Sequence, residues 1–194
     1  MEKMKILNLY AGIGGNRKLW EGHEVTAIES DWNILNVYRQ LFPEDTILCT
    51  DAHQYLLDHH KEYDFIWSSP PCPTHSRAST SLKGWGIVRY PDMALYQEII
   101  FLKHFFKGKW VVENVIPYYE PLIKPTATLD RHHFWSNFPI GDFEVKRDYN
   151  VNRTTKEMLT THHGIELPEG TKDARKLLRN AVYPPLGLHI INQI

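Results

Sequence analysis

The stretch MKILNLYAGIGG, residues 4–15, decides how the rest of this sequence is interpreted. It begins with an apolar run of strand length and ends in glycines, which let a backbone turn tightly and approach a ligand closely. The run predicts a buried strand, and the glycines predict a turn into a helix over residues 16–21. A glycine turn alone is also compatible with a tight turn that binds nothing. No Lys-Ser or Lys-Thr pair follows the glycines, which argues against a nucleoside-triphosphate loop.

The same alternation of apolar runs and amphipathic segments continues to about residue 117. Four more strands are expected at residues 23–29, 45–50, 63–69 and 109–114. Helices are expected at residues 30–42, 51–60 and 90–106, the first with Ser30 or Asp31 as N-cap and the second opening at Asp51. This rhythm predicts an α/β fold with a doubly wound, mostly parallel, Rossmann-like sheet.

After residue 117 the alternation loosens. Strands are expected at residues 131–138 and 143–149, and residues 150–173 are polar and irregular. Residues 174–191 predict a helix, a proline turn and a second helix. No internal repeat or low-complexity linker divides the chain, so residues 1–194 are interpreted as a single domain.

The composition is that of an ordinary globular protein, with 42% hydrophobic and 23% charged residues. Two cysteines are too few for a disulfide framework, which favours a reducing, cytoplasmic setting. The first residues reach glycines too early for a signal peptide, and no apolar run approaches 18 residues. We therefore expect a soluble cytoplasmic protein with no membrane partner.

The formal net charge of −1 conceals an uneven distribution. Residues 1–74 carry 6 basic and 11 acidic side chains, whereas residues 75–194 carry 16 and 12. Between residues 74 and 91 there are three basic side chains (Arg77, Lys83 and Arg89) and no acidic one, with Trp85 and Tyr90 interleaved. Such a stretch suits a nucleic acid, since cations neutralise phosphates and rings stack on bases, although a solvated loop has the same composition.

The ends of the predicted parallel strands carry chemically useful residues. Ligands bind outside the carboxyl ends of the strands in a doubly wound sheet. In chain order these ends supply Gly12, Gly14 and Gly15, then Glu29, Asp51, Cys72 and Glu113. An acid that ends the second strand is typical of a ribose-hydroxyl acceptor, which favours a nucleoside-containing cofactor. Asp51 fits either an adenine amino group or an ordinary helix cap.

Cys72 lies in SSPPCPTHSR, residues 68–77, where prolines restrict the backbone. A thiol beyond a strand end is poorly placed for core packing, and nearby basic groups would lower its pKa and make it a nucleophile. A Cys–His hydrolase pair with His75 is an alternative, but such pairs normally come from separate elements. Glu113, in VVENV, either has a raised pKa and acts as an acid or is a solvated strand end.

In this order, the motifs resemble those of the DNA cytosine-5 methyltransferases, which use S-adenosylmethionine. LNLYAGIGG (residues 7–15) is similar to their cofactor motif, PPC (70–72) to their catalytic motif and ENV (113–115) to their glutamate motif. RNAVYPPLGL (179–188) is similar to the C-terminal motif that returns to the cofactor pocket. The resemblance extends from residue 6 to residue 188, and four motifs in register make it specific.

The resemblance implies a role for each motif. Attack of the Cys72 thiolate on C6 of a cytosine flipped out of double-stranded DNA would activate C5, while Glu113 would hold N3 and the exocyclic amine. Arg131, with His133 in place of the family's second arginine, completes the expected catalytic set. The expected cofactor contacts are Tyr10, Ala11, Gly12, Gly14, Gly15, Glu29, Ser30, Asp51, Ala52, Pro70, Asn180 and Val182. The expected DNA contacts are His75, Ser76, Arg77, Lys83 and Arg89, in a loop that closes over the target.

The sequence also departs from the family pattern. Pro73 replaces the usual glutamine after the catalytic cysteine, and His75 replaces an aromatic residue. Residues 141–179 are a short insert where family enzymes carry a target-recognition domain, so either the recognised site is short or a second protein chain supplies recognition. Two other functions stay open: a non-catalytic or partner-dependent subunit that binds cofactor and DNA, and the same chemistry on RNA or a nucleotide. SPPC also resembles the amino-methyltransferase loop, but Cys72 with ENV favours carbon as the methyl acceptor.

Overall fold

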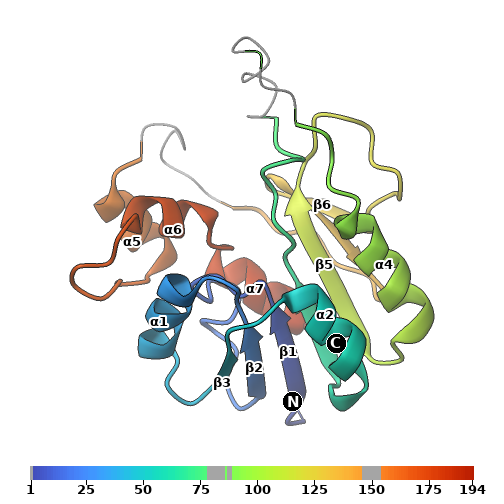
Figure 1. Ribbon diagram of the computed structural model, residues 1–194, viewed down its shortest axis with the longest axis horizontal. Helices are drawn as coiled ribbons and strands as arrows, with labels where there is room; N and C mark the ends of the chain where they lie inside the picture. The colour runs from blue at the N-terminus through green and yellow to red at the C-terminus, as the bar shows by residue number, and fades with distance from the viewer. Residues whose placement is uncertain (1, 78–85, 87–88, 146–153) are drawn as a thin grey trace.

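β1 (Lys5–Leu9) lies in the interior of the fold, as its nearly continuous run of buried side chains requires. The computed structural model describes residues 2–77, 86, 89–145 and 154–194. Within these ranges seven strands form one sheet in the order β3-β2-β1-β4-β5-β7-β6 (Figure 1). The predicted α/β class, with a doubly wound and mostly parallel sheet, is therefore confirmed.

The first five strands are parallel to one another, and helices connect them from β2 onward, whereas successive turns connect β1 to β2. The strands after β1 are β2 (Glu24–Ile28), β3 (Thr46–Leu48), β4 (Phe65–Ser68) and β5 (Lys109–Val115). The helical segments are α1 (Trp32–Leu41), α2 (Ala52–His59), η1 (His60–Glu62) and α4 (Ala94–Phe105). Asp31 and Asp51 are the N-caps of α1 and α2, each accepting a backbone N–H of the first turn as their sequences predict.

The second half of the chain differs more from expectation. β6 (Ala127–Leu129) was not predicted, and it forms an antiparallel hairpin with β7 (His132–Ser136), which pairs with β5. A short helix, α5 (Lys156–His163), lies within the polar stretch read as irregular. The predicted helix at 16–21 is wrong, because the chain forms successive turns there. Residues 143–145 form no strand, and the rest of the strand expected at 143–149 lies outside the described residues.

The C-terminal prediction of two helices separated by a proline turn is confirmed. α6 (Ala174–Asn180) ends before Tyr183, and α7 (Pro184–Ile191) begins with two prolines, whose missing N–H groups need no partner in a first turn. None of the helices in the described part of the chain is long and apolar enough to cross a membrane.

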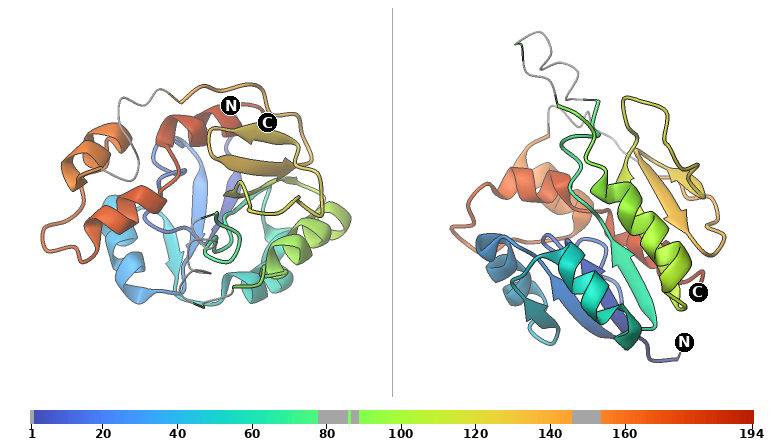
Figure 2. Two further views of the ribbon diagram at one scale, coloured as in Figure 1. Left: turned by 90° about the horizontal axis from the view of Figure 1, so that it is seen from above. Right: turned by 45° about the vertical axis from the view of Figure 1, so that its right-hand side comes forward.

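Helices cover both faces of the sheet (Figure 2). Successive residues of a strand point to opposite faces, so each face has its own set of packed side chains. Leu7, Ile66 and Val112 pack on one face against α2 and α4. Phe65 and Val111 pack on the other face against α7. Both faces of the sheet are buried, and this burial fixes the register of each strand. The register in turn determines on which face of the sheet each polar side chain at a strand end lies.

The strand order reverses between β1 and β4. β1 is followed by β2 and β3 on one side, and the chain then crosses to place β4 and β5 on the other. In doubly wound sheets this switch point leaves a crevice outside the carboxyl ends of the two strands. The glycine turn after β1 and the Cys72 loop after β4 both begin there, as the sequence predicts.

Candidate active site

The glycine turn after β1 adopts a backbone that few side chains tolerate. Gly12 has φ +55° and Gly14 φ +74°, both in the left-handed region, and Tyr10 shares it at φ +54°. A Cβ added at Gly12 would have no atom within 4 Å, so this part of the turn faces open space. The buried amides of Asn8 and Asn16 close the turn through a hydrogen bond of 2.8 Å.

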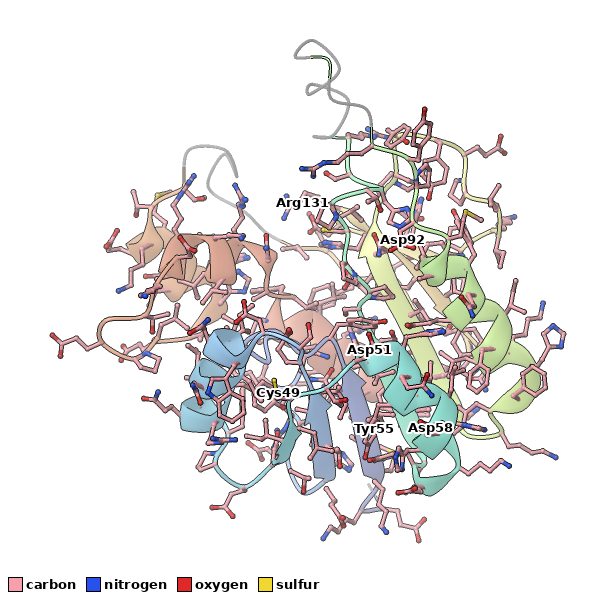
Figure 3. The ribbon with its side chains drawn as sticks, viewed as in Figure 1. Cys49, Asp51, Tyr55, Asp58, Asp92 and Arg131 are labelled. Atoms are coloured by element: carbon pink, nitrogen blue, oxygen red, sulfur yellow. The ribbon has the colours of Figure 1, made fainter. Side chains whose placement is uncertain are left out.

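The acids predicted for the cofactor lie beside this turn. Glu29, just beyond β2, accepts the Gly12 backbone N–H at 3.1 Å and the Asp31 N–H at 3.0 Å. The Ser30 hydroxyl lies 3.5 Å from the same carboxylate. Asp51 accepts the Gln54 N–H at 2.7 Å, so the helix-cap interpretation is correct for one of its oxygens. Ala52, the first residue of α2, is buried. Figure 3 shows Asp51 at the upper end of α2.

The C-terminal motif returns to the same turn. A Cβ on Gly15 would overlap the Val182 carbonyl oxygen and approach Ala181 closely. Val182 is half-buried and Asn180 is exposed at the end of α6. The contact joins segments more than 160 residues apart, and it explains why position 15 requires glycine.

The Cys72 loop is tied to the end of β5. Asn114 is 1% exposed, and its side-chain amide donates to the Pro70 carbonyl at 2.9 Å. The Asn114 amide oxygen accepts the Val115 N–H at 3.0 Å. Further along, the Cys72 carbonyl accepts the backbone N–H groups of His75 and Ser76, each at 3.0 Å. The loop is therefore held by backbone contacts that do not depend on the thiol.

The Cys72 thiol itself is half-buried, and its pKa is raised from the ordinary thiol value, mainly by burial and then by the nearby Glu113 carboxylate. Arg179 and Arg131 act in the opposite direction and lower it, but less strongly. The expected lowering of the thiol pKa by basic neighbours is therefore wrong as a net effect. The resting residue is a thiol, and a proton must leave it before it can attack carbon.

Glu113 is paired with His132, not with His133. The Glu113 carboxylate is 7% exposed and lies 3.5 Å from His132 Nε2. Glu113 faces Phe134 across the β5–β7 pair, and His132 shares that face because it lies two residues from Phe134. His133 points to the other face, where its ring hydrogen-bonds Thr128 at 2.8 Å. The structure therefore brings His132, and not the predicted His133, beside Glu113.

One pocket lies between the β6–β7 hairpin and the C-terminal helical segments. Arg131, His132 and Arg179 line it, along with Asp130, His162 and Ala181. Figure 3 shows Arg131 on the upper side of the molecule, beyond the carboxyl end of β5. Neither His132 nor Arg179 was identified from the sequence. Within the described residues, no group of three or more His, Cys, Asp or Glu side chains is placed to hold a metal ion.

The predicted DNA contacts fall into different environments. His75 is 1% exposed and its ring shares a hydrogen bond of 2.6 Å with the Tyr119 hydroxyl. Its prediction as a DNA contact is therefore wrong, because the ring is buried and fastens the loop to the segment after β5. Ser76 is half-buried, Arg77 and Arg89 are exposed, and Lys83 lies outside the described residues.

Comparison with known proteins decides the family. Residues 4–116, which include the glycine turn, PPC and ENV, match the family described as C-5 cytosine-specific DNA methylase. The chain belongs to that family. The cofactor of this chain is S-adenosylmethionine. None of the curated proteins matches its sequence.

Several solved structures are also similar to this chain, at low sequence identity. A Spodoptera frugiperda DNMT2 mutant is 28% identical over 57% of this chain and 35% of its own, with a TM-score of 0.43. A putative DNA modification methyltransferase encoded in an Escherichia coli prophage is 18% identical over 61% and 34%, with a TM-score of 0.40. An Agrobacterium tumefaciens SAM-dependent methyltransferase is 15% identical over 61% and 40%, with a TM-score of 0.43. The chain thus spans 40% or less of the length of these three proteins.

The residues of the glycine turn fit the cofactor. Open space at Gly12 permits close approach of a ligand to the backbone, and Glu29 and Asp51 place carboxylates at the next two strand ends. Glu29 retains acceptor capacity beyond its backbone contacts, since a carboxylate accepts about four hydrogen bonds. The donor and acceptor set therefore matches a nucleoside-containing cofactor.

Proposed function

We propose that this chain methylates C5 of cytosine in double-stranded DNA, through a covalent bond between Cys72 and C6 of a flipped-out base. The observation that carries the proposal is that Asn114, which follows Glu113 near the end of β5, ties the Cys72 loop to that strand through its 2.9 Å hydrogen bond to the Pro70 carbonyl. The thiol and the Glu113 carboxylate therefore come from the carboxyl ends of the neighbouring strands β4 and β5. Arg131, His132 and Arg179 line a pocket, His132 lies 3.5 Å from the Glu113 carboxylate, and both arginines act to lower the pKa of the Cys72 thiol. Ala181, which also lines this pocket, belongs to the segment that packs against Gly15 of the glycine turn.

S-adenosylmethionine, when bound, supplies an electrophilic methyl group. Tyr10, Ala11, Gly12, Gly14 and Gly15 would hold it at the turn. The other cofactor contacts would be Glu29, Ser30, Asp51, Ala52, Pro70, Asn180 and Val182. Their supporting observation is that all of them lie at strand ends on one rim or, for the last two, in the segment packed against Gly15.

Cys72 begins the reaction once its proton has left. Its sulfur forms a bond to C6, and the C5–C6 double-bond electrons move so that C5 becomes nucleophilic. Glu113, in a form that carries or shares a proton, donates to N3 and accepts from the exocyclic amine, which stabilises the charge that develops at N3, and His132 orients the carboxyl group. After methylation of C5, a base takes up the C5 proton, the C5–C6 double bond forms again, and the Cys72–C6 bond breaks to release Cys72 as a thiolate.

Arg131 and Arg179 stabilise the thiolate form of Cys72. Both are cations near a half-buried sulfur, where low polarity makes charge interactions stronger than in water. Arg77 and Arg89 are exposed beyond the Cys72 loop and would neutralise DNA phosphates. Ser76 and Lys83 complete the proposed DNA contacts.

The insert at residues 141–179 lies where a target-recognition domain is expected. It contributes α5, whose Leu159 packs with Ile13 and Leu178 instead of facing a ligand. Part of the insert is therefore used to cover the glycine turn. We propose that recognition of flanking sequence is either short or supplied by a second protein chain.

The test uses a pool of duplex DNA that contains 5-fluorocytosine, incubated with the chain and labelled S-adenosylmethionine. Fluorine at C5 cannot leave as a proton does, so the Cys72–C6 bond persists and a labelled protein–DNA adduct survives denaturing electrophoresis. The wild type and Cys49→Ser should form this adduct, and Cys72→Ser should not. A wild-type chain that binds cofactor but forms no adduct would refute methylation of duplex DNA by this chain alone. An adduct on single-stranded RNA of the same composition, and none on duplex DNA, would instead support the alternative substrate.

A further inference from the structure

Glu98 is a buried carboxylate that the proposed chemistry does not use. It lies in α4, it is 0% exposed, and its neighbours Leu95, Ile99 and Leu102 belong to the apolar core. Burying a carboxylate in such surroundings is costly unless its lone pairs accept hydrogen bonds. Glu98 therefore needs donors from the elements packed against α4.

Three side chains supply those donors. The Tyr10 hydroxyl donates to Glu98 Oε1 at 2.5 Å, and His53 Nδ1 lies 3.1 Å from the same oxygen. The Ser68 hydroxyl donates to Oε2 at 2.6 Å. The pKa of His53 is raised, chiefly by its hydrogen bond to Glu98, which is the behaviour of a charged pair.

Each donor comes from a different part of the candidate site. Tyr10 belongs to the glycine turn after β1, and His53 follows Asp51 and Ala52 in the first turn of α2. Ser68 is the last residue of β4, immediately before the loop that carries Cys72. A single carboxylate thus connects both sides of the switch point between β1 and β4.

The backbone of Tyr10 shows that the connection carries strain. A tyrosine at φ +54° occupies the left-handed region, which is unfavourable for a side chain with a Cβ and persists only where surrounding contacts enforce it. The 2.5 Å hydrogen bond from its hydroxyl to a buried carboxylate is a contact of that kind, because charge-assisted bonds are the strong ones.

We propose that Glu98 is a positioning residue that couples the cofactor turn to the Cys72 loop. A ligand that fixes Tyr10 also fixes Glu98, and Glu98 in turn fixes Ser68 and the start of the loop. Coupling between two sites is reciprocal, so the state of the loop also changes the affinity of the turn for its ligand. This inference rests on the proposed function, because it assumes that the turn holds the cofactor and that Cys72 reacts.

The test measures two quantities that require neither DNA nor methyl transfer. S-adenosylhomocysteine affinity is measured by calorimetry, and the rate of Cys72 modification by a thiol reagent is measured in a Cys49→Ser background. Tyr10→Phe and Ser68→Ala each remove one donor, leave two on Glu98, and form a double-mutant cycle. The matched control is Tyr55→Phe, which removes a half-buried hydroxyl bonded to Tyr63 at 3.0 Å. Figure 3 shows Tyr55 further down α2 than Asp51, away from the rim.

If Glu98 couples the two sites, Ser68→Ala weakens S-adenosylhomocysteine binding about fivefold although Ser68 is not a proposed cofactor contact. Tyr10→Phe has a similar effect, the double variant is no weaker than either single one, and Tyr55→Phe binds as the wild type does. In the wild type, bound S-adenosylhomocysteine should slow the modification of Cys72 by the thiol reagent. This protection of Cys72 should be lost in Ser68→Ala.

Two results would overturn the coupling. One is additive losses for Tyr10→Phe and Ser68→Ala, and the other is a Ser68→Ala chain whose affinity and Cys72 protection equal those of Tyr55→Phe. Circular dichroism melts of each variant distinguish loss of coupling from loss of folding. A wild type that forms the 5-fluorocytosine adduct but shows additive losses rejects the coupling and leaves the proposed function intact. Non-additive losses without any adduct reject the function and leave the coupling intact.

Discussion

Substitution of Asn114 by alanine is the sharpest test of how the Cys72 loop is held. The Asn114 side chain is 1% exposed and makes two hydrogen bonds, to the Pro70 carbonyl at 2.9 Å and from the Val115 N–H at 3.0 Å. Alanine at position 114 leaves the Pro70 carbonyl and the Val115 N–H without the Asn114 amide as partner, and burial of this site limits the access of water. Each buried group left unsatisfied costs about 1–3 kcal/mol, so the loss of partners for two groups should lower the unfolding free energy of Asn114→Ala by about 2–6 kcal/mol.

Asn137 offers a closely matched control. Its side chain donates to the Gly108 carbonyl at 2.9 Å and accepts the Trp110 N–H at 3.0 Å, the same pair of bonds at the other end of β5. Asn137 is exposed, so water can replace its amide. We expect Asn137→Ala to cost about 1 kcal/mol or less, since a solvated hydrogen bond contributes little net stability.

Urea unfolding of the three chains measures the free energies, and the reaction of Cys72 with a chromogenic disulfide measures the loop. In a Cys49→Ser background, Asn114→Ala should speed the Cys72 reaction about tenfold, corresponding to about 1.4 kcal/mol of easier opening. Asn137→Ala should leave that rate unchanged. Equal stability losses for the two variants would refute the assignment of Asn114 as a buried anchor. A large loss of stability with no change in the Cys72 rate would show that the loop is held elsewhere.

Four further outcomes follow from the same contacts. The alkylation rate of Cys72 should rise with pH to a midpoint above the ordinary thiol pKa, and Arg179→Ala should move that midpoint higher because it removes a cation that lowers the pKa; a midpoint below the ordinary value contradicts this. His132→Ala should slow formation of the 5-fluorocytosine adduct by about 10²-fold, the order seen when a catalytic group loses its orientation, whereas His133→Ala should change it little. Gly15→Ala should destabilise the chain by about 1–3 kcal/mol in urea unfolding, since its Cβ would overlap the Val182 carbonyl, and Gly170→Ala, where the Cβ meets open space, measures the cost of backbone strain alone. Because the His53 pKa is raised in the folded chain, its stabilisation is complete below the ordinary histidine pKa and is lost as pH rises through the folded value; unfolding free energies of wild type and Glu98→Gln should therefore converge over that window.

The strand-end motifs could be read from the sequence because their meeting follows from topology. Any parallel βαβ arrangement brings the carboxyl ends of neighbouring strands to one edge, so the glycine turn, Cys72 and Glu113 meet whatever the packing details. The helix caps at Asp31 and Asp51 are local, since each carboxylate bonds a backbone N–H two or three residues away. The short helix α5 was missed because its apolar face is small and is stabilised by packing on α6 and the glycine turn.

The sequence by itself thus determined the parallel part of the sheet, the order of the motifs and the residues expected to perform chemistry. Only the tertiary structure decided that His132 and not His133 contacts Glu113, because strand register assigns alternate residues to opposite faces and a hairpin not visible in the pattern sets that register. The same holds for the burial of His75 against Tyr119 and for the three donors around Glu98. These partners are 30 to 88 residues apart in the chain, and no local pattern encodes a hydrogen bond that forms only when separate elements pack.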